Sequence, residues 1–265
     1  MEEKLAIVSP KVQTTRHRVK GILSEKDYQI IFSDTPGIID PKYKLHERMM
    51  RVVKNSLEDA DIALLLVDIN DDWTLNDEIF MSLNLKVPAI VFINKTDTAT
   101  HERVKGAVSF FEKRNYCKKA VSISALNTGD RVEILNTILQ FLPLGERFYQ
   151  EDELSDLPTK FFVGELIREK IFELFQEEIP YHSAVVVPEY KEKSSLIKIR
   201  AEIIVHRETQ KAIILGEGGK MIKKLGSKSR EEIEKFVGHK VFLELFVKVK
   251  PNWRENELQL NEYGY

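Results

Sequence analysis

The chain has 265 residues, a length that suggests two domains, and 43% of them are hydrophobic, which is enough to bury ordinary cores. The net charge of −2 excludes a chain that is basic throughout, so any nucleic-acid binding has to come from a local patch. The single cysteine, Cys117, excludes an intrachain disulfide framework and a multi-cysteine zinc site. The apolar runs are too short for a membrane-spanning helix, and the acidic N-terminus does not fit a signal peptide.

The first half of the chain alternates apolar runs with amphipathic segments. The apolar runs predict strands at Tyr28–Ser33, Ile62–Val67, Ala89–Ile93 and Ala120–Ile123. Helices are expected between and after them, at Lys44–Leu57, Leu75–Leu85, His101–Arg114 and Val132–Phe141. Continuous apolar strands separated by helices are typical of a parallel sheet covered on both faces, so this half is expected to be an α/β domain. Three of the strands end directly in polar or glycine-containing motifs, at the sheet edge where such domains bind ligands.

The composition changes near Pro143, where proline, glycine and acidic residues become frequent as far as Pro158. The elements expected after this segment are a helix at Thr159–Gln176, strands at Ser183–Val187 and Leu196–His206, a strand at Ala212–Leu215, a helix to Phe236 and a strand at Lys240–Lys248. This order predicts a small α+β domain. The sequence therefore divides into a domain at 1–145, a linker at 146–158 and a second domain at 159–265.

Asn94-Lys95-Thr96-Asp97 follows one of the buried runs and has the chemistry of a guanine-reading turn. The Asp97 carboxylate is able to accept from guanine N1–H and the 2-amino group together, whereas adenine would leave it unpaired. The Lys95 stem is suited to lie over the base, and Asn94 to tie neighbouring loops by hydrogen bonds. Ser124-Ala125, after the next strand, is expected to offer a backbone N–H to guanine O6. For the tetrapeptide alone, a polar turn without a ligand is the alternative.

Asp34-Thr35-Pro36-Gly37 ends the first predicted strand. Asp34 is placed to hold Mg²⁺ through water, and the Gly37 N–H to meet a γ-phosphate. Upstream, the Thr15 hydroxyl is suited to reach the same Mg²⁺ and to order its loop in the triphosphate state. Taken singly, these segments also fit a Pro-Gly turn and an exposed basic loop. The order and spacing of all the motifs favour a nucleotide site.

Together these residues resemble the Era family of bacterial GTPases, and Glu3–Gly21 is especially similar to the first switch region of that family. The resemblance extends through the closing segment Phe246–Trp253. It implies a P-loop-type G domain that takes GTP or GDP and Mg²⁺. The site residues that it implies are Thr15 and Asp34 near the metal, Gly37 near the γ-phosphate, and Asn94, Lys95, Asp97, Ser124 and Ala125 at the base.

One motif of that family is not in this sequence, because no segment reads G-x-x-x-x-G-K-[S/T]. In the family this phosphate loop lies immediately before the residues that match Glu3 onward, so the G domain is expected to lack its first strand, first helix and P-loop. The strands near Ile30–Ser33 and Ile62–Val67 would then lose a common neighbour and keep unpaired edges. A late start codon, an internal Met1 and a deliberate deletion all remain open as causes. This polypeptide is expected to bind GTP poorly or not at all, and whether it is an enzyme stays open.

Gly216-Glu217-Gly218-Gly219, expected between a strand and a helix, matches the GxxG loop of a KH-type (type II) RNA-binding domain. Glycine is needed there because a Cβ would block the approach of a nucleotide backbone. From Lys211 to Arg230, six lysines and arginines stand against one glutamate, a charge excess that favours phosphate contacts. A plain turn before a helix is the alternative for the loop alone. The predicted RNA contacts are Gly216, Glu217, Gly218, Gly219, Lys220, Lys223 and Lys224.

The resemblance implies a GTP-binding switch that binds 16S ribosomal RNA and assists assembly and maturation of the 30S subunit. It implies a cytoplasmic monomer without DNA as a partner, and peripheral contact with the inner membrane stays open. One alternative is a nucleotide-independent KH-type RNA-binding protein with a degenerate G domain. A GTPase that serves another process, such as RNA modification, would remain only if the KH assignment failed.

Overall fold

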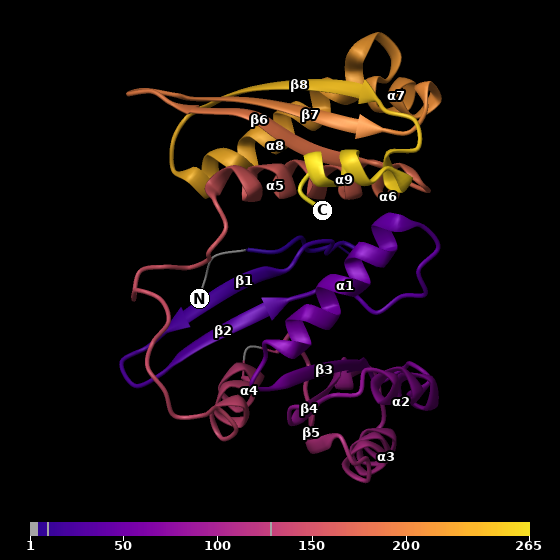
Figure 1. Cartoon of the computed structure of the whole chain (residues 1–265), viewed down its shortest axis with the longest axis vertical. Coiled ribbons are helices and arrows are strands. Elements are labelled where there is room, and N and C mark those ends of the chain that lie inside the picture. Colours follow the sequence, from indigo (N-terminus) through magenta and orange to yellow (C-terminus); the bar gives the residue numbers. More distant parts are fainter. Residues whose placement is uncertain (1–4, 10, 128) are drawn as a thin grey trace. The chain divides into compact units, whose positions relative to one another are not determined.

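The computed structural model describes residues 5–9, 11–127 and 129–265 (Figure 1). Glu3, Lys4 and Pro10 of the family-like segment Glu3–Gly21 lie outside these residues. Contacts divide the chain into two compact units. The smaller is Lys54–Glu146, and the larger combines Met1–Val53 with Arg147–Tyr265.

The smaller unit contains a three-stranded parallel sheet in the order β3-β4-β5. Its strands are β3 (Ala63–Asp68), β4 (Ala89–Asn94) and β5 (Cys117–Ser122), and its helices are α2 (Trp73–Ser82), α3 (His101–Glu112) and α4 (Asp130–Leu139). Every residue from Ala89 to Ile93 is buried, as expected of a central strand with both faces covered. Apolar residues of α2 and α3, among them Phe80 and Phe111, complete the core on one face. The predicted parallel sheet is confirmed for these three strands.

Strand β3 lies at an edge of this sheet. Within the described residues it pairs with β4 alone, and the Leu66 side chain on it is 64% exposed. Strand β2 (Gln29–Asp34), in the larger unit, likewise has a single paired neighbour among the described strands.

An antiparallel hairpin forms the N-terminal part of the larger unit. Strand β1 (Val19–Ser24) pairs with β2, with Val19 opposite Asp34 and Ser24 opposite Gln29. The expectation that the Tyr28–Ser33 run belongs to the parallel sheet is therefore wrong. Strand β1 was not predicted, because Lys20, Gly21 and Ser24 interrupt its apolar pattern and leave no clear period of two.

Helix α1 (Lys44–Glu58) follows the hairpin and begins at the residue that the sequence predicts. Leu45, Met49 and Val53 are buried, at the spacing of four that places side chains on one helix face. Leu45 and Met49 pack with Trp253 and Leu260 in the C-terminal part of the chain. This packing is one reason why the N-terminal residues and the C-terminal residues form a single compact unit.

The segment expected to be a linker contacts the β1–β2 hairpin. The backbone N–H of Ile22 donates to the carbonyl oxygen of Leu154 at 2.9 Å, and the Ser155 hydroxyl donates to the carbonyl oxygen of Lys20 at 2.6 Å. The Lys20 ammonium pairs with Asp156 at 2.8 Å. The segment thus follows the edge of β1. The division into 1–145, 146–158 and 159–265 stays a prediction.

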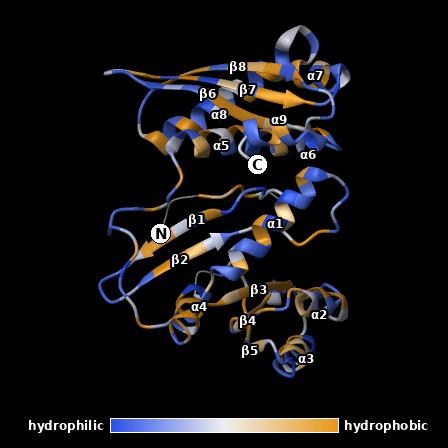
Figure 2. Cartoon of the chain, in the orientation of Figure 1, coloured by the Kyte–Doolittle hydropathy of each residue, from blue (hydrophilic) through white to orange (hydrophobic). Residues whose placement is uncertain are grey.

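The C-terminal part of the larger unit is a three-stranded sheet with helices on it. Its strands are β6 (Ala184–Glu192), β7 (Ile197–Val205) and β8 (Val241–Val249), and its helices are α5 (Thr159–Leu174), α6 (Ile179–His182), α7 (Glu208–Leu215), α8 (Lys220–Val237) and α9 (Glu257–Glu262). Strands β6 and β7 are antiparallel, and β7 and β8 are parallel. Alternate residues of β7 pack under α5 and α8, which explains why the strands of this sheet are largely hydrophobic in Figure 2.

The strand expected at Ala212–Leu215 is instead the end of helix α7. A run of four apolar residues is too short to distinguish a strand from a helix by its period. The start of the helix is fixed by Gln210, whose side-chain oxygen accepts from the backbone N–H groups of His206 and Arg207 at 2.9 and 3.2 Å. The glycine loop therefore lies between two helices and not between a strand and a helix.

Candidate nucleotide and RNA sites

The predicted base-reading residues lie at the carboxyl ends of β4 and β5. Because these parallel strands are in register, with Ile93 opposite Ser122, the loops that follow them are neighbours. The side-chain oxygen of Asn94 accepts from the backbone N–H of Ala125 at 2.9 Å. The structure thus brings Asn94 and Ala125 together, and their hydrogen bond joins the two loops.

Further hydrogen bonds fix the same two loops. The Thr96 hydroxyl donates to the carbonyl oxygen of Ile123 at 2.9 Å, and the backbone N–H of Ser124 donates to the Asp130 carboxylate at 2.6 Å. Asp97 is exposed and receives no hydrogen bond from any other described residue. Its carboxylate is therefore available to a ligand, on a turn that neighbouring loops hold in place.

Lys95 is held by a residue that the sequence reasoning missed. Its ammonium lies 2.6 Å from a carboxylate oxygen of Asp68, the last residue of β3. The hydrogen bond from Lys95 lowers the pKa of Asp68, and the same bond raises the pKa of Lys95. Asp68 lies opposite Asn94 in the sheet register. Its position, as a carboxylate directly after the buried run Ile62–Val67, is the sequence signal that could have identified it as part of this site.

The predicted metal ligands meet in the larger unit. The Thr15 hydroxyl donates to an Asp34 carboxylate oxygen at 3.1 Å. Desolvation by surrounding protein atoms raises the pKa of Asp34, and the bond from Thr15 opposes that shift. Gly37 is exposed, with open space where a Cβ would lie. A hydroxyl and a carboxylate are oxygen ligands of the kind that Mg²⁺ prefers, so these two residues fit the metal that the sequence implies.

The sequence lacks the motif whose residues would hold the phosphates. The 265 residues contain no G-x-x-x-x-G-K-[S/T], and the glycine-rich segment at Gly216–Gly219 lies in the C-terminal sheet domain. A phosphate loop supplies successive backbone N–H groups and a lysine to the β- and γ-phosphates. The sequence thus provides a base-reading turn and a metal pair without that phosphate cradle.

The glycine loop after α7 has the backbone that glycine permits. Gly216, Gly218 and Gly219 have φ values of 69°, 57° and 77°. A Cβ on Gly216 would come within 2.7 Å of the Met221 side chain, whereas a Cβ on Gly218 or Gly219 would meet nothing within 4 Å. The space beside Gly218 and Gly219 is the open approach that a nucleotide backbone needs.

Basic side chains surround this loop. Lys220, Lys223 and Lys224 are all exposed on the first turns of α8. The ammonium of Lys220 lies 3.8 Å from the Glu217 carboxylate, and both side chains are largely exposed, so solvent screens this pair. The predicted RNA-contacting residues therefore lie together, on one loop and one helix start.

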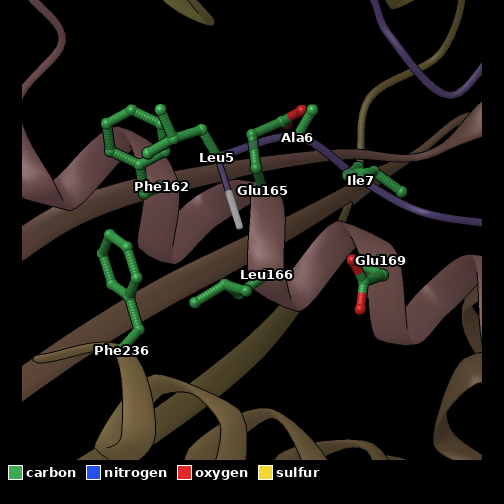
Figure 3. A pocket seen from close by; sticks show the side chains of 8 residues that line it. All are labelled: Leu5, Ala6, Ile7, Phe162, Glu165, Leu166, Glu169 and Phe236. Carbon is green, nitrogen blue, oxygen red and sulfur yellow. The ribbon is translucent and has the colours of Figure 1, made fainter. Parts of the chain in front are cut away.

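A pocket elsewhere in the larger unit contains none of the predicted site residues. It lies where the N-terminal segment crosses α5, and it is lined by Leu5, Ala6, Ile7, Phe162, Glu165, Leu166, Glu169 and Phe236 (Figure 3). Its walls are mainly apolar, and the Glu169 carboxylate accepts from the backbone N–H of Val8 at 3.4 Å. The pocket shows that the N-terminal segment packs on α5.

No described helix is long and apolar enough to cross a membrane. In the part of the chain that the structure describes, no group of three or more His, Cys, Asp or Glu side chains is arranged to hold a metal ion.

Two family models match the chain in separate parts. A model described as a KH domain matches residues 178–254, and one described as a 50S ribosome-binding GTPase matches residues 1–95. GTPase Era of Caldanaerobacter subterraneus subsp. tengcongensis is 43% identical to this sequence over 100% of this chain and 90% of its own length. GTPase Era of Staphylococcus haemolyticus is 39% identical over 99% of this chain and 89% of its own length.

Solved structures with the same fold cover the whole chain. Era in complex with MgGDPNP and nucleotides 1506–1542 of 16S ribosomal RNA is 38% identical, with a TM-score of 0.95 over 100% of this chain and 91% of that one. Aquifex aeolicus Era bound to GDP·AlF4⁻ is also 38% identical, with a TM-score of 0.95 over 100% of this chain and 92% of that one. The chain has the Era-like fold, in which a G domain precedes a KH domain, and it belongs to the Era GTPase family.

Proposed function

We propose that this chain is a guanine-nucleotide-binding and ribosomal-RNA-binding protein that assists assembly of the small ribosomal subunit. The observation that carries the proposal is the likeness over the entire chain, at a TM-score of 0.95, to Era solved with MgGDPNP and a segment of 16S ribosomal RNA. Since the fold and 38% of the residues are shared, the same two classes of ligand are expected here.

The base-reading turn supports a preference for guanine. Asp97 is exposed on a loop that the Asn94–Ala125 hydrogen bond ties to its neighbour, so the carboxylate is held ready to accept from N1–H and the 2-amino group. Adenine would leave this carboxylate unpaired, which typically costs about 1–3 kcal/mol or more. The Lys95 stem, oriented by its ion pair with Asp68, would lie along the base.

Thr15 and Asp34 support a role in sensing the triphosphate. Both would contribute oxygen atoms to a bound Mg²⁺, Thr15 directly and Asp34 through water, and the Gly37 N–H would meet the γ-phosphate. When bound, Mg²⁺ would neutralise charge on the phosphates. Without a phosphate loop in these residues, weak nucleotide binding is expected from this polypeptide.

The KH domain would provide the contact with RNA. The open space beside Gly218 and Gly219 admits a nucleotide backbone, and Lys220, Lys223 and Lys224 would contact phosphates. As partners we propose 16S ribosomal RNA and the 30S subunit, with no role for DNA. We place the protein in the cytoplasm as a monomer, and contact with the inner membrane is not part of the proposal. The G domain, linker and KH domain would correspond to residues 1–145, 146–158 and 159–265.

A second candidate function is supported by one observation. Because the sequence contains no G-x-x-x-x-G-K-[S/T], the chain could act as a nucleotide-independent RNA-binding protein whose G domain is a remnant. The RNA-binding half of the proposal is common to both candidates, so nucleotide binding is what distinguishes them.

Binding of mant-GDP and mant-GDPNP with Mg²⁺ separates the two functions. The titration is done on this polypeptide, on a form extended by the codons that precede Met1 in the gene, and on Asp97→Ala versions of both. The proposal predicts tight binding by the extended form, loss of at least tenfold in affinity with Asp97→Ala, and weak binding by the shorter form. If neither form binds, the protein is not a guanine-nucleotide switch, and the RNA-binding function stands alone.

A further inference from the structure

The segment that carries Thr15 is fixed to the KH domain before and after that residue. The Lys11 ammonium donates to the carbonyl oxygen of Phe172 at 2.6 Å and also to that of Phe175, at the end of α5. The carbonyl oxygen of Thr14 accepts from the Arg168 guanidinium, a buried group that pairs with Glu165 at 2.5 Å. The backbone that presents Thr15 is therefore held by residues more than 150 positions away in sequence.

Arg16 makes the most extensive of these contacts. Its side chain is 5% exposed, and its guanidinium donates to the carbonyl oxygens of Ser183 at 2.7 Å, Tyr181 at 2.8 Å and Pro180 at 3.1 Å. It also donates to the Tyr265 hydroxyl at 3.2 Å. A planar guanidinium with five N–H groups can span several acceptors at once, whereas a lysine ammonium cannot reproduce that fork.

The groups around the Arg16 guanidinium suit this side chain in particular. All four acceptors are neutral oxygens, and no carboxylate of the described residues forms an ion pair with this buried cation. A buried charge is costly unless its hydrogen bonds are well made. The carbonyl oxygens of Pro180, Tyr181 and Ser183 therefore form a receptor for one side chain of the Thr15 segment.

Tyr265 connects this receptor to a second segment. Its ring stacks on His17 with the centroids 4.6 Å apart, and its carbonyl oxygen accepts from Arg48 of α1. Helix α1 follows the Asp34–Gly37 motif in the chain. One aromatic residue thus touches the segment that carries Thr15 and the helix that follows the Asp34–Gly37 motif.

We propose that Arg16 is a positioning residue, through which the KH domain holds Thr15 beside Asp34. The proposal rests on the proposed function, in which these two residues serve a Mg²⁺-bound nucleoside triphosphate. The Thr15 hydroxyl lies 3.1 Å from an Asp34 carboxylate oxygen. The side chain of the next residue, Arg16, lies in the carbonyl receptor. Binding of a Mg²⁺-bound nucleoside triphosphate at Thr15 and Asp34 would stabilise the docking of Arg16, and docking of Arg16 would stabilise that binding, as linkage requires.

Hydrogen exchange on the full polypeptide tests the positioning role. Arg16→Lys keeps the charge and removes the fork, so amide exchange in 12–18 should rise by about tenfold. Arg51→Lys, the same change at an exposed position of α1, should leave exchange in 12–18 unchanged. Tyr265→Phe removes one acceptor and keeps the ring, so it should raise exchange by a smaller factor, and it replaces Arg16→Lys if that variant does not fold. Unchanged exchange in 12–18 in both folded variants would overturn the proposal.

A second measurement separates positioning from general stability. In the form that binds nucleotide, Arg16→Lys should weaken mant-GDPNP by about tenfold and mant-GDP by less than twofold, because Thr15 serves the triphosphate state. An equal loss for both nucleotides would show a merely structural role and overturn the proposal. If no form binds nucleotide, the proposed function fails, and the exchange result alone decides whether Arg16 holds the segment.

Discussion

Gly216 shows how the absence of one side chain shapes the candidate RNA loop. Its φ of 69° lies in the region that favours glycine, and an added Cβ would approach the Met221 side chain to 2.7 Å. Gly218 has a similar φ of 57°, but no atom lies within 4 Å of its added Cβ. With ψ at 174°, Gly216 combines a backbone that is nearly restricted to glycine with a steric clash, whereas Gly218, with ψ at 23°, has a left-handed backbone and no clash.

Gly216→Ala should destabilise the larger unit by about 2–3 kcal/mol, because strain and overpacking act together. Gly218→Ala should cost about 1 kcal/mol, since only the backbone preference is lost. Urea unfolding followed by Trp253 fluorescence in a Trp73→Phe background measures both, because Trp253 lies in the larger unit. Equal losses for the two variants would contradict the steric account.

His182 makes the larger unit sensitive to acid. Its pKa is lowered to about 4, first by burial and next by the nearby Arg254 cation. The Gln210 side-chain oxygen accepts two backbone N–H groups, so its amide nitrogen donates to His182 Nδ1 at 3.1 Å, which requires the neutral ring. The other charged or titratable groups near the ring are Glu178, which raises the pKa, and His206 and Arg16, which lower it.

Because the folded-state pKa of His182 lies below its unfolded value of 6.5, the unfolded chain binds a proton first as the pH falls. The stability that the neutral ring contributes is complete above pH 6.5 and is lost between pH 6.5 and about 4. The full shift corresponds to about 3 kcal/mol, and partial exposure reduces the expected loss to about 1–2 kcal/mol. Urea unfolding in the Trp73→Phe background should show this loss, and His182→Gln should flatten the pH dependence in that window. An unchanged slope in His182→Gln would assign the acid sensitivity to other groups.

At the scale of elements, the sequence predicted well where an apolar run is fully buried between turns or where one helical period dominates. The fully buried run Ala89–Ile93 and the amphipathic helix α1 were both located within a residue of their observed bounds. The prediction failed at Ala212–Leu215, where four apolar residues have no measurable period, and at Val19–Ser24, where a strand of mixed character gains its order from pairing with β2. In both places the deciding contacts lie outside the segment itself.

The expected linker shows the same dependence on distant contacts. Its proline-rich and acidic composition indicated a linker, and the Gln29 side chain forms three hydrogen bonds with the backbone of this segment. The amide nitrogen donates to the carbonyl oxygen of Tyr149 at 3.0 Å, and the side-chain oxygen accepts from Phe148 and Tyr149 at 3.0 and 3.1 Å. Through these bonds, Gln29 connects the backbone of Phe148 and Tyr149 to the end of the β1–β2 hairpin.

Gln29→Ala should release the segment and make the peptide bond after Arg147 several times more sensitive to trypsin, because protection depends on local order. Gln140→Ala, at an exposed position of the smaller unit, is the matched control and should leave the cleavage rate unchanged. Mass spectrometry of the early digest measures the rate. Equal rates in the two variants would mean that Gln29 does not hold the segment.

At the scale of the molecule, the compact units do not follow the order of the chain. The sequence assigned residues 1–145 to one domain, whereas contacts join Met1–Val53 to Arg147–Tyr265. Bonds such as that between Arg16 and Ser183, which are 167 positions apart, leave no periodic or compositional signal. The motifs at Asn94–Asp97, Asp34–Gly37 and Gly216–Gly219 were visible in the sequence because their chemistry is local, while Asp68 and the carbonyl receptor for Arg16 required the fold.

The most direct test of the account is the binding of labelled RNA, spanning nucleotides 1506–1542 of 16S ribosomal RNA, to this polypeptide over a range of salt concentrations. Fluorescence anisotropy should show salt-dependent binding. Lys223→Glu with Lys224→Glu should weaken it strongly and reduce the salt slope by about 1.4, since each lost contact with a single-stranded phosphate accounts for about 0.7. The same reversal at Lys118 and Lys119 of β5, in the smaller unit, should leave both quantities unchanged. Absent binding, or equal losses from the two pairs, would contradict the assignment of RNA recognition to the Gly216–Lys224 surface.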